Sequence, residues 1–317
     1  MAVDAATASP FAKREFTVPR SLRLLARLPF GALYALTQAV TLLLRYGLRY
    51  RLQTVQGNLR RCFPNLRPAA LDKIVARYYR HLGEVAAEVI KLASLSADEL
   101  RERVRFPNLD LVQQETRAGR SVILLAAHLH NWEWQLQGIA VQLGVPIDAA
   151  YKPLHSAWAE RAQLALRSQF GARMVAAKRL PRAMARHRSE VHAIALIADQ
   201  VPVSSDRRHW LNFLGSPTAF YTGPAQIAHV TGYATFFAAT RRVARGRYEI
   251  RFERVSSAQQ RLDTQTFTQR YAHLLEEQIR ADPSGWLWSH RRWKLVPPAP
   301  LATTAPSSGF ADGAIRI

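Results

Sequence analysis

The sequence predicts a mixed α/β fold in which helices flank a sheet, preceded by a hydrophobic helical segment near the N-terminus. From residue 121 onward, apolar strand-like runs alternate with stretches of helical periodicity, the pattern of an α/β unit. Residues 21–100 instead carry apolar side chains at three- and four-residue spacing. Hydrophobic residues make up 48% of the 317-residue chain, so enough apolar surface is present to exclude a disordered protein.

A helical lead-in is expected over residues 21–100. Its clearest part is LDKIVARYYRHLGEVAAEVIKLASL, residues 71–95, whose apolar side chains recur on one helical face. A new helix is predicted at Ser96, because Ser96 and Glu99 have the spacing of a capping box. Residues 1–20 contain no long apolar run and no small-residue cleavage site. We therefore expect a flexible basic N-terminus and not a removed signal peptide.

Residues 28–44, LPFGALYALTQAVTLLL, form the longest uncharged apolar run, with arginines on both sides. Its 17 residues are at the short limit for crossing a bilayer. Because basic residues flank both ends, the positive-inside rule does not orient the segment. We expect a membrane anchor, either spanning or embedded, and the alternative is a buried helix that never meets lipid.

The α/β domain is expected over residues 101–296. Buried strands are predicted at SVILLAAH (121–128), PIDAAYKP (146–153) and HAIALIADQ (192–200), with helices between them and more alternating strands at 233–243 and 247–255. Functional groups in such a fold lie beyond the carboxyl ends of the strands. Residues 297–317 are rich in Pro, Ala, Ser and Thr, and we expect a disordered tail.

Charge and cysteine content restrict the partners and the compartment. The formal net charge of +21 attracts polyanions, which include anionic lipid surfaces, acidic proteins and nucleic acid. A non-catalytic basic membrane- or nucleic-acid-binding protein is the alternative from a different class, although the sequence contains no nucleic-acid-binding motif. The one cysteine, Cys62, excludes an intramolecular disulfide and is expected to be a buried packing residue.

The candidate catalytic residues lie in SVILLAAHLHNWEW, where an apolar strand runs into His128 and a helix is predicted to begin after Asn131 as N-cap. We expect Glu133, in the first turn of that helix, to meet His128. A carboxylate on one imidazole nitrogen leaves the other nitrogen to accept a proton from a hydroxyl. An ordinary loop hydrogen bond is the alternative. Zinc binding by His128 and His130 is less favoured, since few further ligands follow.

Two later segments also carry candidate binding residues. Gly215 and Gly223 in FLGSPTAFYTGPAQ are interpreted as positions where a side chain would obstruct the chain or a ligand, with Thr222 beside them, and two ordinary turns are the alternative. The C-terminal PSGWLWSHRRWK mixes cations with indole rings, which is typical of a membrane interface with phosphates. Its cations are Arg291, Arg292 and Lys294, and its indoles are Trp286, Trp288 and Trp293.

Six blocks in order resemble the lipid A biosynthesis acyltransferase family, which includes the lauroyl and myristoyl transferases. HLHNWEW is similar to its H-x-x-x-x-D/E element, and ALIADQ resembles its D-Q strand end. The other four blocks are RLQTVQGNLRRCFPNL, YKPLHSAWAERAQLALRSQFGAR, FLGSPTAFYTGPAQIA and PSGWLWSHRRWK. The first of these four is followed by YYRHLGEVAAEVIKL, which resembles the family's next helix. The likeness runs from about Leu22 to Lys294.

This resemblance implies a glycerolipid-acyltransferase-like fold and transfer of a fatty acyl chain from acyl carrier protein, or acyl-CoA, to a hydroxyl of a lipid A precursor. It implies His128 as general base and Glu133 as its orienting carboxylate, with no cofactor and no metal. It places the enzyme on the cytoplasmic side of the bacterial inner membrane. The residues expected to bind substrate are Asn131, Trp132, Tyr151, Lys152, Arg167, Asp199, Gln200, Gly215, Thr222, Gly223, Arg291 and Arg292.

One residue departs from the family pattern. His130 stands where relatives often carry glycine, as in H-x-G-N-W-E, and a larger side chain there is expected to narrow the acyl or acceptor path. The acceptor therefore stays open between a lipid A precursor and another lysophospholipid, amino-lipid or glycolipid.

Overall fold

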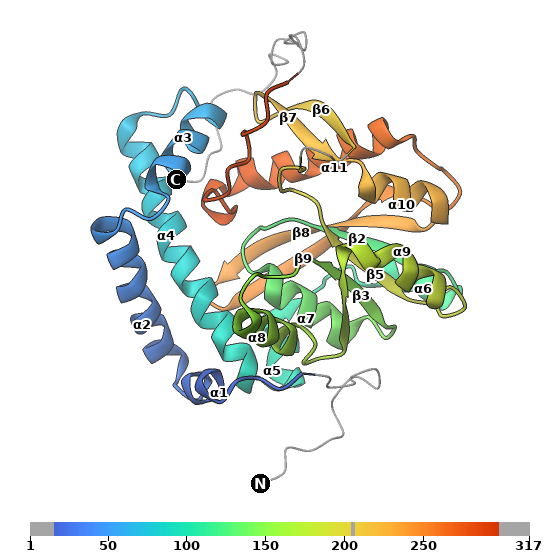
Figure 1. Cartoon of the computed structure of the whole chain (residues 1–317), viewed down its shortest axis with the longest axis horizontal. Coiled ribbons are helices and arrows are strands. Elements are labelled where there is room, and N and C mark those ends of the chain that lie inside the picture. The colour runs from blue at the N-terminus through green and yellow to red at the C-terminus, as the bar shows by residue number, and fades with distance from the viewer. Residues whose placement is uncertain (1–15, 204–206, 298–317) are drawn as a thin grey trace.

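The computed structural model describes residues 16–203 and 207–297, arranged as a seven-stranded mixed sheet flanked by helices (Figure 1). The strand order is β1-β9-β8-β2-β5-β3-β4, and the central pairs β8–β2, β2–β5, β5–β3 and β3–β4 are all parallel. Only the β8–β9 pair is antiparallel. The strands are β1 Val104–Arg105, β2 Val122–Ala126, β3 Ile147–Tyr151, β4 Ala172–Ala176, β5 Ala193–Ile197, β8 Ala234–Ala244 and β9 Arg247–Ser256. The predicted mixed α/β class is confirmed.

Strand β2 shows why the sheet is buried on both faces. Its Ile123 and Leu125 belong to one apolar cluster, while Val122 and Leu124 belong to another on the opposite face. Side chains alternate between the faces of a strand, so a continuous apolar run suits a parallel strand covered on both sides. Helices α10 Gly223–Thr231 and α11 Thr264–Ala281 cover the first face, and α7 Trp132–Gln142 and α8 Ala157–Arg167 cover the second (Figure 1).

The helical lead-in is dominated by α4, Pro68–Lys91, which lies between α2 and the sheet (Figure 1). The predicted capping box is confirmed: the Ser96 hydroxyl accepts from the Glu99 backbone N–H at 3.1 Å, and the Glu99 carboxylate accepts from the Ser96 N–H at 2.9 Å. Cys62 is buried, as expected. The lead-in and the remaining connecting helices are α1 Arg20–Ala26, α2 Phe30–Leu42, the π-helical turn Leu43–Gly47, α3 Leu52–Cys62, α5 Ala97–Arg103, α6 Asp110–Arg117 and α9 Leu180–Arg186.

The segment expected to anchor the protein forms a two-sided helix. Leu33 and Tyr34 of α2 pack against Ala87 of α4, whereas Leu36 and Val40 on the other side are exposed. Within the described residues, no one helix combines the length and apolar character needed to cross a bilayer. The pair Arg20–Ala26 and Phe30–Gly47, bent by 114°, has the length and composition to do so. The predicted anchor is thus partly a helix packed on the core.

A separate two-stranded hairpin, β6 Arg208–Phe213 and β7 Ser216–Tyr221, packs near α11 (Figure 1). Its two-residue turn has φ of 51° at Leu214 and 75° at Gly215, the left-handed geometry that glycine tolerates best. A Cβ at Gly215 or at Gly223 would meet no atom within 4 Å. Side chains at these positions would therefore not obstruct the chain, whereas obstruction of a ligand stays a prediction: Gly215 serves the turn, and Gly223 begins α10.

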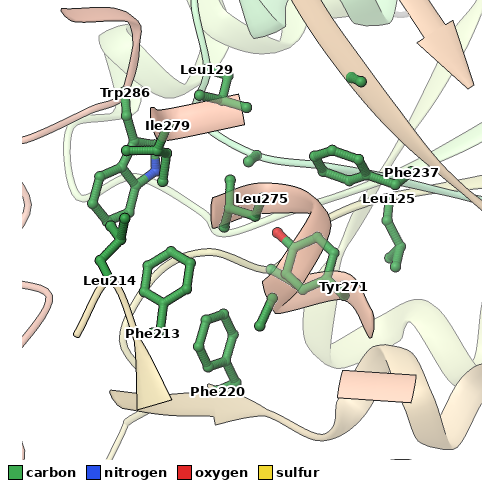
Figure 2. Packing of buried hydrophobic residues seen from close by; sticks show 14 of the residues in the cluster. Leu125, Leu129, Phe213, Leu214, Phe220, Phe237, Tyr271, Leu275, Ile279 and Trp286 are labelled. Atoms are coloured by element: carbon green, nitrogen blue, oxygen red, sulfur yellow. The ribbon is translucent and has the colours of Figure 1, made fainter. Parts of the chain in front are cut away.

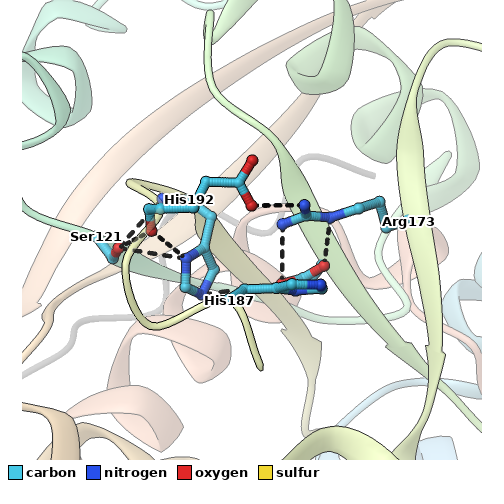
Figure 3. A network of polar contacts seen from close by, with 6 residues as sticks. Ser121, Arg173, His187 and His192 are labelled. Carbon is cyan, nitrogen blue, oxygen red and sulfur yellow. Dashed lines mark hydrogen bonds and ion pairs between the residues drawn. The ribbon is translucent and has the colours of Figure 1, made fainter. Parts of the chain in front are cut away.

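At the amino ends of the strands, a network of polar side chains joins neighbouring parts of the sheet (Figure 3). The fully buried Asp148 carboxylate accepts from Arg173 Nε at 2.7 Å and bonds His187 Nδ1 at 2.9 Å. Arg173 also reaches Glu190 at 2.6 Å, and the Ser121 hydroxyl accepts from the His192 backbone N–H at 3.1 Å. This network ties β3 and β4 to the segment before β5. It lies at the opposite end of the strands from the site described next.

Candidate functional site

His128 lies just beyond the carboxyl end of β2, and the parallel register of β2 with β5 brings Asp199 beside it. Ala126 pairs with Ile197, so the residues two positions later fall opposite each other. His128 Nδ1 is 2.7 Å from Asp199 Oδ1, and the His128 backbone N–H donates to Asp199 Oδ2 at 2.9 Å. The expected placement of His128 and Asp199 at strand ends is confirmed.

The Asp199 carboxylate is buried and held as an anion. Trp286 Nε1 donates to its Oδ2 at 2.8 Å, in addition to the two bonds from His128. Burial by itself would raise the pKa of this carboxyl, but the His128 charge and the three donated hydrogen bonds lower it to about 2. With its Nδ1 proton directed at Asp199, the imidazole presents Nε2 as the acceptor, 3.3 Å from Gln200 Nε2. This is the arrangement of a general base.

Glu133 has different partners from those expected. Its Oε2 accepts from Arg167 Nε at 2.7 Å, and its Oε1 accepts from Arg167 Nη2 and, at 3.0 Å, from Trp132 Nε1. The expectation that Glu133 holds the His128 imidazole is therefore corrected, because Arg167 at the end of α8 occupies this carboxylate in a two-pronged ion pair. Glu133 reaches His128 only through the Trp132 ring, whose centroid is 5.0 Å from that of the imidazole.

An apolar cavity opens next to this ion pair, between α7 and the sheet. Trp132, Glu133 and Arg167 contribute to its lining where it approaches the catalytic side of the sheet. The rest of its wall is mostly aliphatic or aromatic and comes from β2, β3, β4, β5, β8, β9, α7 and the residue after β1. These residues include Phe106, Leu124, Leu136, Ile139, Ala149, Ala150, Met174, Ala195, Leu196, Ala238 and Phe252. Such a lining suits a hydrocarbon chain, since it offers few polar partners.

Trp286, Trp288 and Arg292 are buried and not at a surface, so the interpretation as a membrane interface does not hold for these three residues. Trp286, labelled in Figure 2, and Trp288 are 3% and 0% exposed and belong to the larger core cluster. Trp293 is partly buried against the same cluster. Arg292 is 2% exposed and stacks over the Phe220 ring, with 4.6 Å from its Cζ to the centroid. Its guanidinium has no hydrogen-bond partner among the described residues, and burial lowers its pKa to about 10. Arg291 and Lys294 are exposed.

The other expected binding residues are spread over the molecule. Tyr151 and Lys152 end β3 at the same edge of the sheet as His128, with Lys152 exposed. Asn131 is buried and caps α7, since its Oδ1 accepts from the Trp134 N–H at 2.9 Å. Thr222 is buried and its hydroxyl donates to the Arg207 carbonyl at 3.2 Å, beside the β6–β7 hairpin.

Trp286 bonds to the Asp199 carboxylate, whereas the sequence analysis assigned it to a membrane interface. The only signal for it was the aromatic C-terminal motif, which says nothing about a contact with a carboxylate 87 residues earlier. Asn58 helps to hold this segment in place, because its Nδ2 donates to the carbonyls of Trp288 and His290 at 2.8 and 2.9 Å. Leu287 N–H then donates to the His128 carbonyl at 3.1 Å. The segment that follows α11 is therefore part of the site.

His130 faces away from the apolar cavity. Its ring lies against α4, with 5.3 Å between its centroid and that of His81, and its backbone N–H donates to the Gly285 carbonyl at 2.7 Å. His130 adopts φ of 49°, which is costly for a residue with a side chain and natural for glycine. His130 does not line the apolar cavity, so its ring does not narrow that space, and narrowing of an acceptor path stays a prediction. Among the described residues, no group of three His, Cys, Asp or Glu side chains is placed to hold a metal ion.

The buried His130 generates a prediction about acid stability. Burial, with a further contribution from His81, lowers the pKa of His130 to about 3, whereas the unfolded chain titrates near the usual value of about 6.5. Between these values the unfolded state binds a proton that the folded state does not. Stability from this group is therefore lost as pH falls below about 6.5, at up to about 1.4 kcal/mol per pH unit.

We expect His130→Gly to flatten this dependence. The free energy of unfolding, measured by urea titration from pH 7 to pH 4, should fall less steeply in the variant than in the unchanged protein. The slope is the readout, because the glycine also removes packing and alters the absolute stability. Parallel slopes for the two proteins would contradict a buried neutral His130. His273→Gly is the control, since His273 is an exposed helical histidine.

Comparison with known proteins identifies the family. The family described as bacterial lipid A biosynthesis acyltransferase matches residues 13–295. A lipid A biosynthesis acyltransferase from Haemophilus influenzae is 24% identical over 154 residues, which are 48% of this chain and 48% of that protein. The chain is thus aligned with about half the length of this curated relative. The family match spans the lead-in, the whole sheet and the C-terminal segment that contains Trp286. The chain therefore belongs to the bacterial lipid A biosynthesis acyltransferase family.

Proposed function

We propose that this protein transfers a fatty acyl chain from an acyl carrier protein thioester to a hydroxyl group of a lipid A precursor. The observation that carries the proposal is the His128–Asp199 pair, a base with one nitrogen held by a buried carboxylate at 2.7 Å and the other directed away from it. The family match supplies the substrate class, and the apolar cavity beside Glu133 and Arg167 supplies space for the acyl chain.

His128 Nε2 accepts the proton of the acceptor hydroxyl as its oxygen attacks the thioester carbonyl carbon. The tetrahedral intermediate then collapses, the carbon–sulfur bond breaks, and the imidazolium returns the proton to the leaving thiolate. Asp199 stabilises the imidazolium between these steps. Because the acceptor hydroxyl is the nucleophile, the enzyme needs no serine or cysteine of its own.

Glu133 acts in this scheme through its neighbours. Its ion pair with Arg167 joins the first turn of α7 to the end of α8, and its bond to Trp132 Nε1 sets the ring that packs on His128. Glu133 and Arg167 also stand at the apolar cavity. We therefore assign Glu133 as a positioning residue for both the base and the acyl chain, with Arg167 as its partner.

The proposed donor and location follow from charge and surface chemistry. Acyl carrier protein is acidic, and a net charge of +21 steers it towards the enzyme while attracting anionic lipid. The outer side of α1, α2 and the following π-helical turn exposes Leu24, Leu36, Val40, Leu43 and Tyr46 beside the exposed Arg20, Arg23 and Arg27. This combination suits an anionic inner-membrane surface, with the site on the cytoplasmic side.

The mechanism predicts a ranking of three variants in acyl transfer. His128→Ala should lower kcat at least ~10²-fold, because it removes the general base. Asp199→Asn should also cost at least ~10²-fold, because the amide cannot stabilise the imidazolium and changes the tautomer. Glu133→Gln should cost less than either. Turnover is measured by mass spectrometry of the acylated lipid, with circular dichroism as the folding control. A folded His128→Ala variant of normal activity would refute the proposal.

The cavity predicts acyl-chain selection. Ala195 lines it on β5, so Ala195→Leu should fill part of the space and shift preference towards shorter acyl thioesters. Ile139→Ala, on the facing helix α7, should shift it towards longer ones. Competition between carrier-protein thioesters of two chain lengths measures the ratio directly. If a variant loses turnover of the shorter and the longer thioester in equal proportion, so that their ratio is unchanged, the acyl chain lies outside this cavity.

The exposed side of α2 predicts binding to lipid vesicles. Val40→Glu and Leu43→Glu together should weaken sedimentation with vesicles containing phosphatidylglycerol, because both side chains are about half exposed or more, at 49% and 60%. Val230→Glu is the matched control, since Val230 is 78% exposed on α10, on a different part of the surface. If the control weakens binding as much as the α2 variant, net charge and not this surface determines attachment.

A further inference from the structure

Glu88 on α4 is a fully buried carboxylate outside the His128–Asp199 pair. Its Oε2 accepts hydrogen bonds from Asn131 Nδ2 and from the Tyr248 hydroxyl, both at 2.7 Å. Its Oε1 accepts from the Tyr34 hydroxyl at 3.0 Å. The three donors come from three different parts of the fold: α2, the loop before α7, and β9. A buried carboxylate is costly unless such bonds satisfy it.

Asn131 connects this carboxylate to the catalytic loop. It lies between His128 and Glu133, and while its amide nitrogen binds Glu88, its amide oxygen caps α7 at the Trp134 N–H. The Trp134 indole also donates to the Glu88 backbone carbonyl at 2.9 Å. The start of α7 is therefore attached to α4 at two points, and the loop that carries the base is confined between that attachment and β2.

Tyr34 connects the same carboxylate to α2. Tyr34 is 8% exposed, and its hydroxyl lies so close to the β8–β9 turn that a Cβ at Gly246 would be 2.8 Å from it. Burial, together with the Glu88 charge, raises the pKa of Tyr34 and of Tyr248 well above the usual value, so both hydroxyls stay protonated and donate. One turn earlier on α4, Glu84 is neutralised separately by Arg242 at 2.6 Å and Arg245 at 2.9 Å.

We propose that Glu88 is a positioning residue for the catalytic loop, and that helix α2, docked through the Tyr34 hydroxyl, forms part of the support of the active site. The same helix then carries the inward-facing Tyr34 that bonds Glu88 and the outward-facing apolar side chains proposed to bind lipid. Anything that lifts α2 from α4 removes a donor from Glu88 and loosens Asn131. The activity arm of the test rests on the proposed acyl transfer, whereas its second arm does not.

The test compares four variants: Glu88→Gln, Tyr34→Phe, Tyr248→Phe and, as control, Glu115→Gln. Glu115 on α6 is also a buried carboxylate, 6% exposed, but it binds Arg120, which lies between α6 and β2, and Arg254 on β9. Glu88→Gln should lower kcat at least ~10-fold and each Tyr→Phe about 3-fold to 10-fold, as expected for loss of one positioning hydrogen bond. The KM values should stay near those of the unchanged enzyme, and Glu115→Gln should leave kcat unchanged.

Amide hydrogen exchange of residues 128–134, followed by mass spectrometry, is the arm that needs no turnover. Exchange there should quicken in Glu88→Gln and in both Tyr→Phe variants, and not in Glu115→Gln. Unchanged exchange and kcat in Tyr34→Phe would overturn the part played by α2, and the same result in Tyr248→Phe and Glu88→Gln would overturn the whole proposal. If Glu88→Gln does not fold, the two tyrosine variants decide. An enzyme without acyl transfer but with this exchange pattern would refute the proposed function alone.

Discussion

The buried Asp199 carboxylate is the constraint on which the catalytic end of the molecule depends. A carboxylate removed from water costs several kcal/mol unless charged or hydrogen-bonding partners replace the lost solvent. Here the replacement comes from two bonds with His128 and one with Trp286. Because Trp286 follows α11, the C-terminal segment must fold over the end of β5 before the anion is satisfied. The catalytic base, the sheet register and the last segment are therefore ordered together.

Helix α4 has a similar role on the other side of the loop. It places Glu84 and Glu88 one turn apart, so that both carboxylates lie on the same helical face. Glu84 is matched by Arg242 from β8 and Arg245 from the β8–β9 turn, and Glu88 is matched by neutral donors. The first interaction fastens the sheet to α4, and the second fastens the loop. Of the two carboxylates, only Glu88 bonds to the loop that carries His128.

The apolar cavity and the exposed side of α2 are two places where apolar side chains are not covered by other parts of the protein. The cavity is internal and ends at the Glu133–Arg167 ion pair, whereas the exposed side of α2 is external and adjoined by arginines. An amphiphilic substrate has both an acyl chain and an anionic head group. The protein has an apolar cavity beside the Glu133–Arg167 ion pair in one place, and an exposed apolar helix beside exposed arginines in the other.

The local sequence predicted the α/β class, the strands β2, β3 and β5, the more alternating strands β8 and β9, and the capping box at Ser96. These features depend on side chains close together in the chain, and the alternation of apolar residues records them directly. The short strands β1 and β4 were not predicted, because they pair with partners far away in the sequence. The β6–β7 hairpin was not predicted either, although its two strands are joined by a two-residue turn. Nearly all of the predicted tail at 297–317 and most of the predicted basic N-terminus lie outside the described residues.

His128 at a strand end was also determined by the local sequence, and family likeness pointed to Glu133 and Asp199. Only the tertiary structure decided which carboxylate holds the imidazole. Glu133 is five residues from His128 but binds Arg167, while Asp199 is 71 residues away and binds the ring. The parallel register of β2 and β5 makes that choice, and register is a property of two strands in contact that neither strand's own sequence encodes.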